Sequence, residues 1–304
     1  MKQLSFLLLV LLLSSCCATK QVVNKQEKEV TQVETKAEVE VELKNEVEVE
    51  LENDVEKVLT EVKNEVEIKK DSTIVNNEFH QKLTKRMSTN VHLIWDELLK
   101  ANVSNQGNVD YKAFKENYKK LLGYFHILNL MKSNKQFESF SRNEKLAFWI
   151  NAYNAFTVDL IIRNYPVKSI KDIKDPWKQR YWKLGEKWYN LDEIEHQILR
   201  KMKEPRIHFA IVCASYSCPK LQNEAFTTAK LDTQLTNATT AFLADKNRNS
   251  ITQNSLRLSK IFQWFAKDFK QDGSLIDFLN KYTEVQISSK AKKSFKTYNW
   301  NLND

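Results

Sequence analysis

Residues 206–221, RIHFAIVCASYSCPKL, hold most of the side chains in this chain that could carry out covalent chemistry. Cys213 and Cys218 are separated by four residues, and Ser215 and Ser217 lie between them. A thiolate is a strong nucleophile, and the backbone N–H groups of a tight turn can bind an anion or an oxyanion. The stretch therefore predicts a functional corner at which one thiol attacks a substrate.

The same two cysteines also suit a structural disulfide. Four intervening residues at a corner let two cysteines meet, and an exported protein meets an oxidising environment. Buried free thiols are another alternative, as is zinc binding together with histidines, but the spacing matches no common zinc module. We expect no metal and no cofactor, and the disulfide remains open as the rival of a catalytic thiol.

His196 and His208 are the candidates for activating a thiol. Residues 207–214 are apolar and rich in β-branched side chains, which predicts a strand. Side chains alternate between the two faces of a strand, so His208 should point away from Cys213. His196 is expected on a helix opening near Asp192, which precedes it by four residues and could orient its ring. If Asp192 is instead the N-cap, its oxygen is occupied and this role weakens; a purely structural hydrogen-bonded His196 is the alternative.

Asn151 and Asn154 stand on a predicted helix, residues 142–164, that is otherwise mostly apolar. Two amides on an apolar face need partners, because an unpaired buried polar group costs about 1–3 kcal/mol. They could hold or polarise a substrate beside the catalytic group. Alternatively, they could cap the backbone of a neighbouring irregular segment.

The elements that position these residues begin near residue 78, where aromatic and spaced apolar residues replace a charged segment. Hydrophobic periodicity predicts helices over 80–101, 111–132, 142–164, 192–202, 223–245 and 259–282. Ser141 and Glu144 form a capping-box pattern, and residues 181–191 predict a hairpin that turns at Gly185. The prediction is one α+β domain, residues 78–304, mostly helical with a small β-sheet.

Several stretches of this predicted domain share a resemblance. They are VDYKAF (109–114), LAFWINAYNAFTVDLII (146–162), YNLDEIEHQILR (189–200), RIHFAIVCASYSCPKL (206–221), LSKIFQWFAKDF (258–269) and YNWNLN (298–303). Taken in order, they resemble the DUF547 family, whose name records that no function has been assigned to it. The resemblance covers about residues 90–303. It implies a shared fold and a shared special site at the cysteine corner, but no particular reaction.

The N-terminus, MKQLSFLLLVLLLSSCC, predicts where the chain is sent. A lysine, an apolar run and small residues form the layout of a secretory signal peptide, residues 1–15. The run from Leu4 to Leu13 is about half the length of a membrane-spanning helix. Residues 13–16, LSSC, resemble the bacterial lipobox, which predicts lipidation of Cys16 and a membrane anchor; a plain secretory signal is the alternative. Because Cys17 is not an inner-membrane retention aspartate, we expect an outer-membrane lipoprotein of the cell envelope.

Residues 16–77 are predicted to be an acidic tether rich in Glu, Val and Lys, either disordered or partly helical as a short coiled coil. Within it, residues 25–70 carry a net charge of −7, although the whole chain carries +8. The rest of the chain is therefore strongly basic. No nucleic-acid-binding motif accompanies this charge, so the expected partner is an envelope ligand or substrate and not a nucleic acid; an anionic ligand suits the positive charge.

Two functions from different classes remain open at this point. The first is a thiol-dependent hydrolase or acyl transferase of the cell envelope, with Cys213 as nucleophile, His196 as base, Asp192 orienting it, and Asn151 or Asn154 polarising the substrate. The second is a noncatalytic, lipid-anchored binding or scaffold module with a Cys213–Cys218 disulfide. The first predicts a cleft that gathers these side chains and at least one reduced cysteine.

Overall fold

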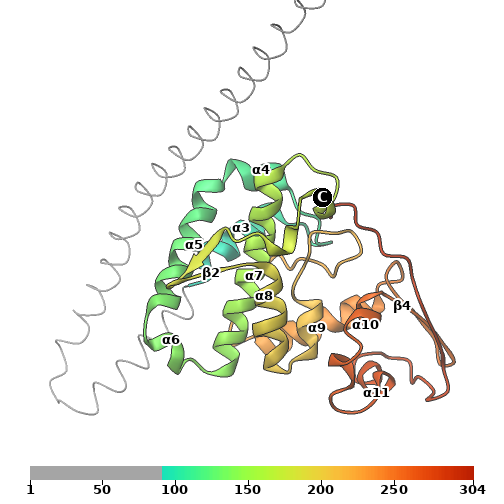
Figure 1. Ribbon diagram of the computed structural model, residues 1–304. Coiled ribbons are helices and arrows are strands. Elements are labelled where there is room, and N and C mark those ends of the chain that lie inside the picture. Colours follow the sequence, from blue (N-terminus) through green and yellow to red (C-terminus); the bar gives the residue numbers. More distant parts are fainter. Residues whose placement is uncertain (1–90) are drawn as a thin grey trace, which may run out of the picture. The chain divides into compact units, whose positions relative to one another are not determined.

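The computed structural model describes residues 91–304 (Figure 1). The predicted signal peptide, the lipidation site Cys16 and the tether lie outside these residues. Within the described part, no helix is long and apolar enough to cross a membrane. The fold class is a mostly helical α+β domain with two small sheets, as the sequence predicted.

The first half of the described chain is helical. Its helices are α3 (Leu93–Asn102), α4 (Tyr111–Glu116), α5 (Tyr118–Ser133), α6 (Gln136–Ser139) and α7 (Arg142–Asn164). The predicted helix 111–132 is interrupted at Asn117, which lies between α4 and α5. The capping box at the start of α7 is confirmed, because the Ser141 side chain accepts from the Glu144 amide and Glu144 accepts from the Ser141 amide.

Helix α7 is the centre of the larger hydrophobic core. Every residue from Leu146 to Ile162 is buried, and the helix packs against α4 and α5 on one side and the helical segment after residue 190 on another (Figure 1). A helix that is apolar all round must be enclosed on all sides. This enclosure makes α7 a fixed support for the segments that form the site.

A short linker and a hairpin follow α7. The linker contains the 3₁₀ turns η1 (Ile170–Asp172) and η2 (Pro176–Lys178). Strands β1 (Trp182–Leu184) and β2 (Lys187–Tyr189) then form the predicted antiparallel hairpin, in which Trp182 pairs with Tyr189. Gly185 takes a positive φ of 61° in the turn, a conformation that glycine adopts without strain.

One helical segment then runs from residue 191 to residue 202. It consists of α8 (Leu191–Glu193), the π-helical η3 (Ile194–Leu199) and the 3₁₀ turn η4 (Arg200–Met202). The N-cap is Asn190, whose side chain accepts from the Glu193 amide, so Asp192 is not the N-cap. Because Asn190 caps the helix, the carboxylate of Asp192 is free to face His196.

The predicted strand over 207–214 is wrong. Residues Pro205–Phe209 form the 3₁₀ helix η5, and Ala214 has a positive φ of 57°. The backbone here forms hydrogen bonds with a side chain instead of with a neighbouring strand: Asn154 donates to the carbonyl of Ala210 and accepts from the amide of Val212. An apolar run shows that a segment is buried, but a buried helical turn and a buried strand look alike in sequence.

The last part of the chain surrounds a second core of phenylalanines. It contains α9 (Leu231–Ala244), β3 (Ser250–Ile251), β4 (Ser255–Leu258), α10 (Ile261–Trp264), η6 (Asp268–Lys270), α11 (Leu275–Asn280) and β5 (Lys292–Phe295). Strand β4 pairs antiparallel with β3 and parallel with β5. The predicted helix 259–282 is broken into three pieces, because Gly273 turns the chain and Ser274 caps a new helix. The predicted helix 223–245 begins only at Leu231.

Candidate thiol site

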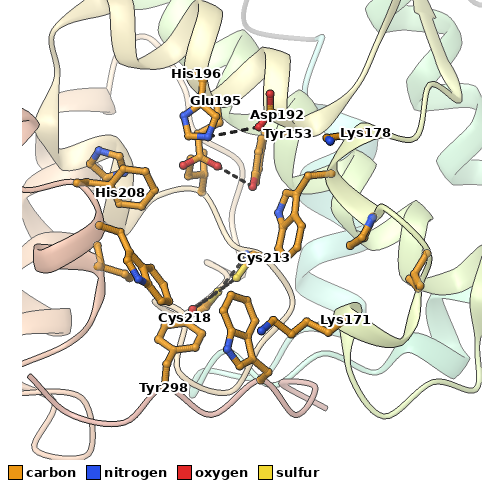
Figure 2. A pocket seen from close by; sticks show the side chains of 18 of the residues that line it. Tyr153, Lys171, Lys178, Asp192, Glu195, His196, His208, Cys213, Cys218 and Tyr298 are labelled. Carbon is orange, nitrogen blue, oxygen red and sulfur yellow. Dashed lines mark hydrogen bonds and ion pairs between the residues drawn. The ribbon is translucent and has the colours of Figure 1, made fainter.

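A cavity of about 710 Å³ opens between both halves of the domain (Figure 2). Its lining comes from Tyr153 on α7 and from residues within 171–178, 192–196, 208–219, 261–265 and 298–300. The sequence-predicted residues on this lining are Asp192, His196, His208, Cys213 and Cys218. The structure therefore gathers them around one space, as a catalytic cleft requires.

The two cysteines are free thiols in direct contact. Their Sγ atoms lie 2.6 Å apart, and the backbone N–H of Cys213 donates to Sγ of Cys218 over 3.1 Å. Cys213 is partly exposed, whereas Cys218 is buried. The corner thus offers one accessible sulfur to the cavity and keeps a second sulfur directly behind it.

Two hydroxyl groups complete the surroundings of the sulfurs. Ser215 Oγ lies 3.3 Å from Cys213 Sγ and 3.2 Å from Cys218 Sγ, and it donates to the Tyr298 hydroxyl over 2.9 Å. The Tyr298 oxygen lies 3.5 Å from Cys213 Sγ and 3.2 Å from Cys218 Sγ. Because Ser215 donates to Tyr298, the phenol hydrogen is available to a sulfur.

These contacts set the ionisation of the pair. Burial alone would raise the pKa of Cys218, but its hydrogen-bonding contacts with Cys213, Ser215 and Tyr298 outweigh it and lower this pKa to about 6. The pKa of Cys213 is raised by its hydrogen bond to Cys218 and by burial. The pair therefore holds a single proton near neutral pH, with a thiol on Cys213 and a thiolate on Cys218.

Three backbone amides of the turn between the two cysteines already have hydrogen-bond partners. The amides of residues 216–218 donate to the carbonyls of Asn301, Asn299 and Ser215, respectively. The Ser217 hydroxyl is also occupied, since it accepts from the Asn299 amide over 2.9 Å. The segment around residue 300 uses two of these donors and the turn itself uses the third, so the amides of residues 216–218 are not available to the predicted anion or oxyanion.

His196 lies on the opposite side of the cavity from the sulfurs (Figure 2). Its Nδ1 is 3.0 Å from a guanidinium nitrogen of Arg200, and its Nε2 is 3.5 Å from the Asp192 carboxylate. A guanidinium can only donate, so Nδ1 accepts and the hydrogen of the neutral ring sits on Nε2. Burial lowers the pKa of His196, which favours this neutral ring. His196 is therefore placed as a hydrogen-bond donor, not as a proton acceptor.

His208 lines the cavity but serves a different partner. Its Nε2 lies 2.8 Å from Asp268, its ring stacks on Phe265 with 4.0 Å between centroids, and Arg200 binds Asp268 through two further hydrogen bonds. Within residues 91–304, no hydrogen bond joins His196 or His208 to a sulfur. In the same part of the chain, no cluster of three or more His, Cys, Asp or Glu side chains could hold a metal ion.

Comparison with known proteins shows a similarity between part of this chain and one family. Residues 137–243 match the family described as "Protein of unknown function, DUF547". This matched part, the DUF547 segment, is similar to that family. No curated protein and no solved structure matches the chain. The DUF547 segment supplies Tyr153, His196 and both thiols, while Tyr298 comes from beyond it.

Asn151 and Asn154 hold the backbone of the DUF547 segment. Asn151 donates to the carbonyl of Phe226 over 2.8 Å and accepts from its amide over 3.0 Å. Asn154 bonds Ala210 and Val212 in the same way, at 2.9 Å each. Both amides are occupied, so neither is available to polarise a substrate as predicted. Both asparagines instead cap the backbone of neighbouring irregular segments, which was the alternative prediction.

Glu195 and Tyr153 are site residues of the DUF547 segment that the sequence did not reveal. The Glu195 carboxylate is buried, lines the cavity and accepts a hydrogen bond of 3.1 Å from the Tyr153 hydroxyl (Figure 2). Burial raises the pKa of Glu195 to about 7, although Tyr153 and Arg200 oppose the shift. The only signal in the sequence was that this glutamate directly precedes His196.

Proposed function

We propose that the cavity is the active site of a thiol-dependent acyl transferase or hydrolase with Cys213 as nucleophile. The observation that supports this most is the thiol–thiolate pair, which presents the partly exposed Cys213 to a cavity of about 710 Å³ and keeps a proton acceptor, Cys218, beside it. Nucleophilic catalysis needs such an acceptor next to the attacking group.

In the first step, the Cys213 proton passes to the Cys218 thiolate as the Cys213 sulfur attacks the acyl carbonyl. The C–S bond forms, the bond to the leaving group breaks, and the Cys218 thiol gives its proton to that leaving group. The Nε2 hydrogen of His196, across the cavity from the sulfurs, is placed to donate to the part of the substrate that lies away from Cys213. The products are an acyl-Cys213 thioester and a restored Cys218 thiolate.

In the second step, a water molecule or another acceptor attacks the thioester. Its proton goes to the Glu195 carboxylate, whose pKa of about 7 suits a group that accepts and returns a proton near neutral pH. The C–S bond breaks, and Glu195 returns the proton to the Cys213 sulfur. His196, which was predicted as the base, thus becomes a positioning donor, and Glu195 takes the basic role.

An activated ester tests the proposal on the full chain. We expect 4-nitrophenyl acetate to release an initial burst of nitrophenol and to leave an acetyl group on Cys213, found by peptide mass mapping. Cys213→Ser should abolish the adduct, while Cys218→Ser should form it more slowly because the proton acceptor is lost. A fully reduced protein that gives no adduct, or an adduct confined to Cys218, contradicts the proposal.

The second candidate is a noncatalytic binding or scaffold module with a structural Cys213–Cys218 disulfide. The contact between the sulfurs supports it, because the cysteines can join without movement of the backbone. Protein purified without reductant and alkylated at once distinguishes the two functions. A permanent disulfide, together with no acylation after reduction, favours the module.

We also propose that the chain is an envelope lipoprotein anchored by lipidated Cys16 and displayed at the outer membrane. The support is the sequence LSSC at residues 13–16 after an apolar run. Adjacent cysteines provide a matched pair of variants. We expect Cys16→Ser to lose incorporation of a labelled fatty acid and membrane association, and Cys17→Ser to retain both. Equal labelling of the two variants contradicts the anchor.

A further inference from the structure

The cavity has a basic side formed by the linker after α7. Lys171, Lys174 and Lys178 of this linker all line the cavity and are exposed. None of them forms an ion pair with any residue between 91 and 304. Instead, the ammonium group of Lys171 lies 4.4 Å from the centre of the Trp300 ring. Three cations at the edge of one cavity, without carboxylate partners in this part of the chain, favour a bound anion.

An aromatic cluster lies next to this basic side. The ring centroids of Trp264 and Trp300 are 5.7 Å apart, and Tyr298 lies 4.8 Å from Trp264 and 4.5 Å from Trp300. Trp264 remains 47% exposed although it packs against other rings. An exposed tryptophan on a concave surface gains stability when an apolar body or the face of a ring covers it.

Acidic groups also line the cavity. Asp192 and Glu195 belong to the helical segment 191–202, and the Cys218 thiolate lies at the thiol corner. Asp175 is the acidic residue of the linker itself that lines the cavity. Figure 2 shows Lys171 and Lys178 on one side of the cavity and His208 on the other, with the sulfurs between them. This asymmetry can orient a ligand that is charged at one end.

We propose that the substrate is an amphipathic anion, with a carboxylate or phosphate held by Lys171, Lys174 and Lys178 and an apolar or ring-shaped body against Trp264 and Trp300. That this ligand is a substrate rests on the proposed acyl chemistry, but its binding does not require that chemistry. A carboxylated sugar and a phosphorylated alkyl chain share the necessary features.

Binding to the full chain carrying Cys213→Ser tests the proposal without any reaction. Two matched probe pairs differ mainly in the anionic group: N-acetylmuramic acid against N-acetylglucosamine, and octyl phosphate against octanol. Quenching of tryptophan fluorescence reports occupancy, since Trp177, Trp264 and Trp300 line the cavity. We expect the anionic member of at least one pair to bind about tenfold more tightly than its neutral partner. The pair with the larger preference identifies the source of the anion.

Two sets of variants assign this preference to the cavity. Replacing Lys171, Lys174 and Lys178 by Gln should remove the preference, whereas replacing the exposed Lys112, Lys115 and Lys290 should not, although the change in net charge is the same. Trp264→Ala should weaken both members of the preferred pair by a similar factor. Equal affinity within both pairs, a preference that survives the first triple variant, or no binding of any probe overturns the proposal. Failure of acylation alone overturns only the proposed reaction.

Discussion

The backbone amide of Cys213 donates to the sulfur of Cys218 over 3.1 Å, so the two cysteines are joined by the main chain of one and the side chain of the other. The donor is a main-chain group, so the fold fixes its position and its charge does not change with pH. It stabilises negative charge on the buried sulfur while the accessible sulfur keeps its proton. In the proposed reaction, the nucleophile Cys213 and the proton acceptor Cys218 are therefore in direct contact, and no imidazole is required between them.

The thiolate should be visible by titration. We expect the ultraviolet absorbance of the thiolate to appear near pH 6 in the wild-type protein, because Cys218 has a pKa of about 6. Cys213→Ser and Tyr298→Phe should each move the transition to higher pH, since each removes or weakens a hydrogen bond to Cys218. Cys218→Ser should abolish it. A wild-type transition found only above pH 8 contradicts the assigned thiolate.

Oxidation should switch the site off reversibly. The sulfurs are in contact, so a mild thiol oxidant such as diamide should produce a Cys213–Cys218 disulfide and prevent acylation of Cys213. Dithiothreitol should restore both thiols and the reaction. Mass mapping under non-reducing conditions measures the bond, and the single variant Cys218→Ser serves as the control that cannot form it. Acylation that persists in fully oxidised protein would show that Cys213 is not the acyl acceptor.

Asn154 should matter for stability. Asn154→Ala removes two buried hydrogen bonds and leaves the carbonyl of Ala210 and the amide of Val212 without partners. We expect a loss of about 2–4 kcal/mol in the free energy of unfolding, measured by urea denaturation. The exposed Asn247 is the matched control, and its replacement by alanine should change stability by less than about 0.5 kcal/mol. Equal effects of the two variants would contradict the supporting role of Asn154.

His92 should make the fold sensitive to acid. It is fully buried beside the Tyr124 hydroxyl, 2.7 Å from Nδ1, and burial lowers its pKa from 6.5 to about 3. Below pH 6.5 the unfolded chain therefore binds a proton at His92 that the folded chain does not bind, so the free energy of unfolding falls as the pH falls. Between pH 7 and pH 5 we expect His92 to contribute a loss of about 2 kcal/mol.

Urea unfolding at pH 7 and pH 5 measures this contribution. His92→Gln should reduce the loss between the two pH values, although the variant itself is less stable at pH 7. Tyr124→Phe keeps the histidine buried and should retain the wild-type pH dependence. His208, whose pKa burial also lowers, acts in the same direction and leaves part of the acid sensitivity in every variant. An unchanged pH dependence in His92→Gln would rule out the assigned role.

Local signals predicted the parts of the fold that local interactions decide. Ser141 and Glu144 cap α7, and Gly185 turns the β1–β2 hairpin, because the stabilising contacts lie within a few residues. The strand assigned to residues 207–214 was wrong because its backbone partners belong to Asn154, more than fifty residues away. No spacing in the sequence announces such a contact.

The sequence likewise revealed some residues of the candidate site and not others. The thiol corner and His196 stood out because cysteine and histidine are rare and chemically active. Tyr298 was quoted only as part of a resemblance, and its hydroxyl reaches sulfurs that lie about 80 positions earlier in the chain. Glu195 is special only because the fold buries it, and burial of one carboxylate among many on a charged helix is a tertiary property. Its neighbour Asp192 remains exposed.

The segment at residues 298–302 lies along the thiol turn, where Leu302 pairs with Ser215 and the carbonyls of Asn299 and Asn301 receive its amides. Translation reaches Tyr298 only 80 residues after Cys218. Until then the thiol turn lacks its hydrogen-bond acceptors, and Cys218 lacks the phenol that helps to hold its charge. A nascent chain would therefore carry two ordinary thiols, and the reactive pair would form only at a late stage of folding.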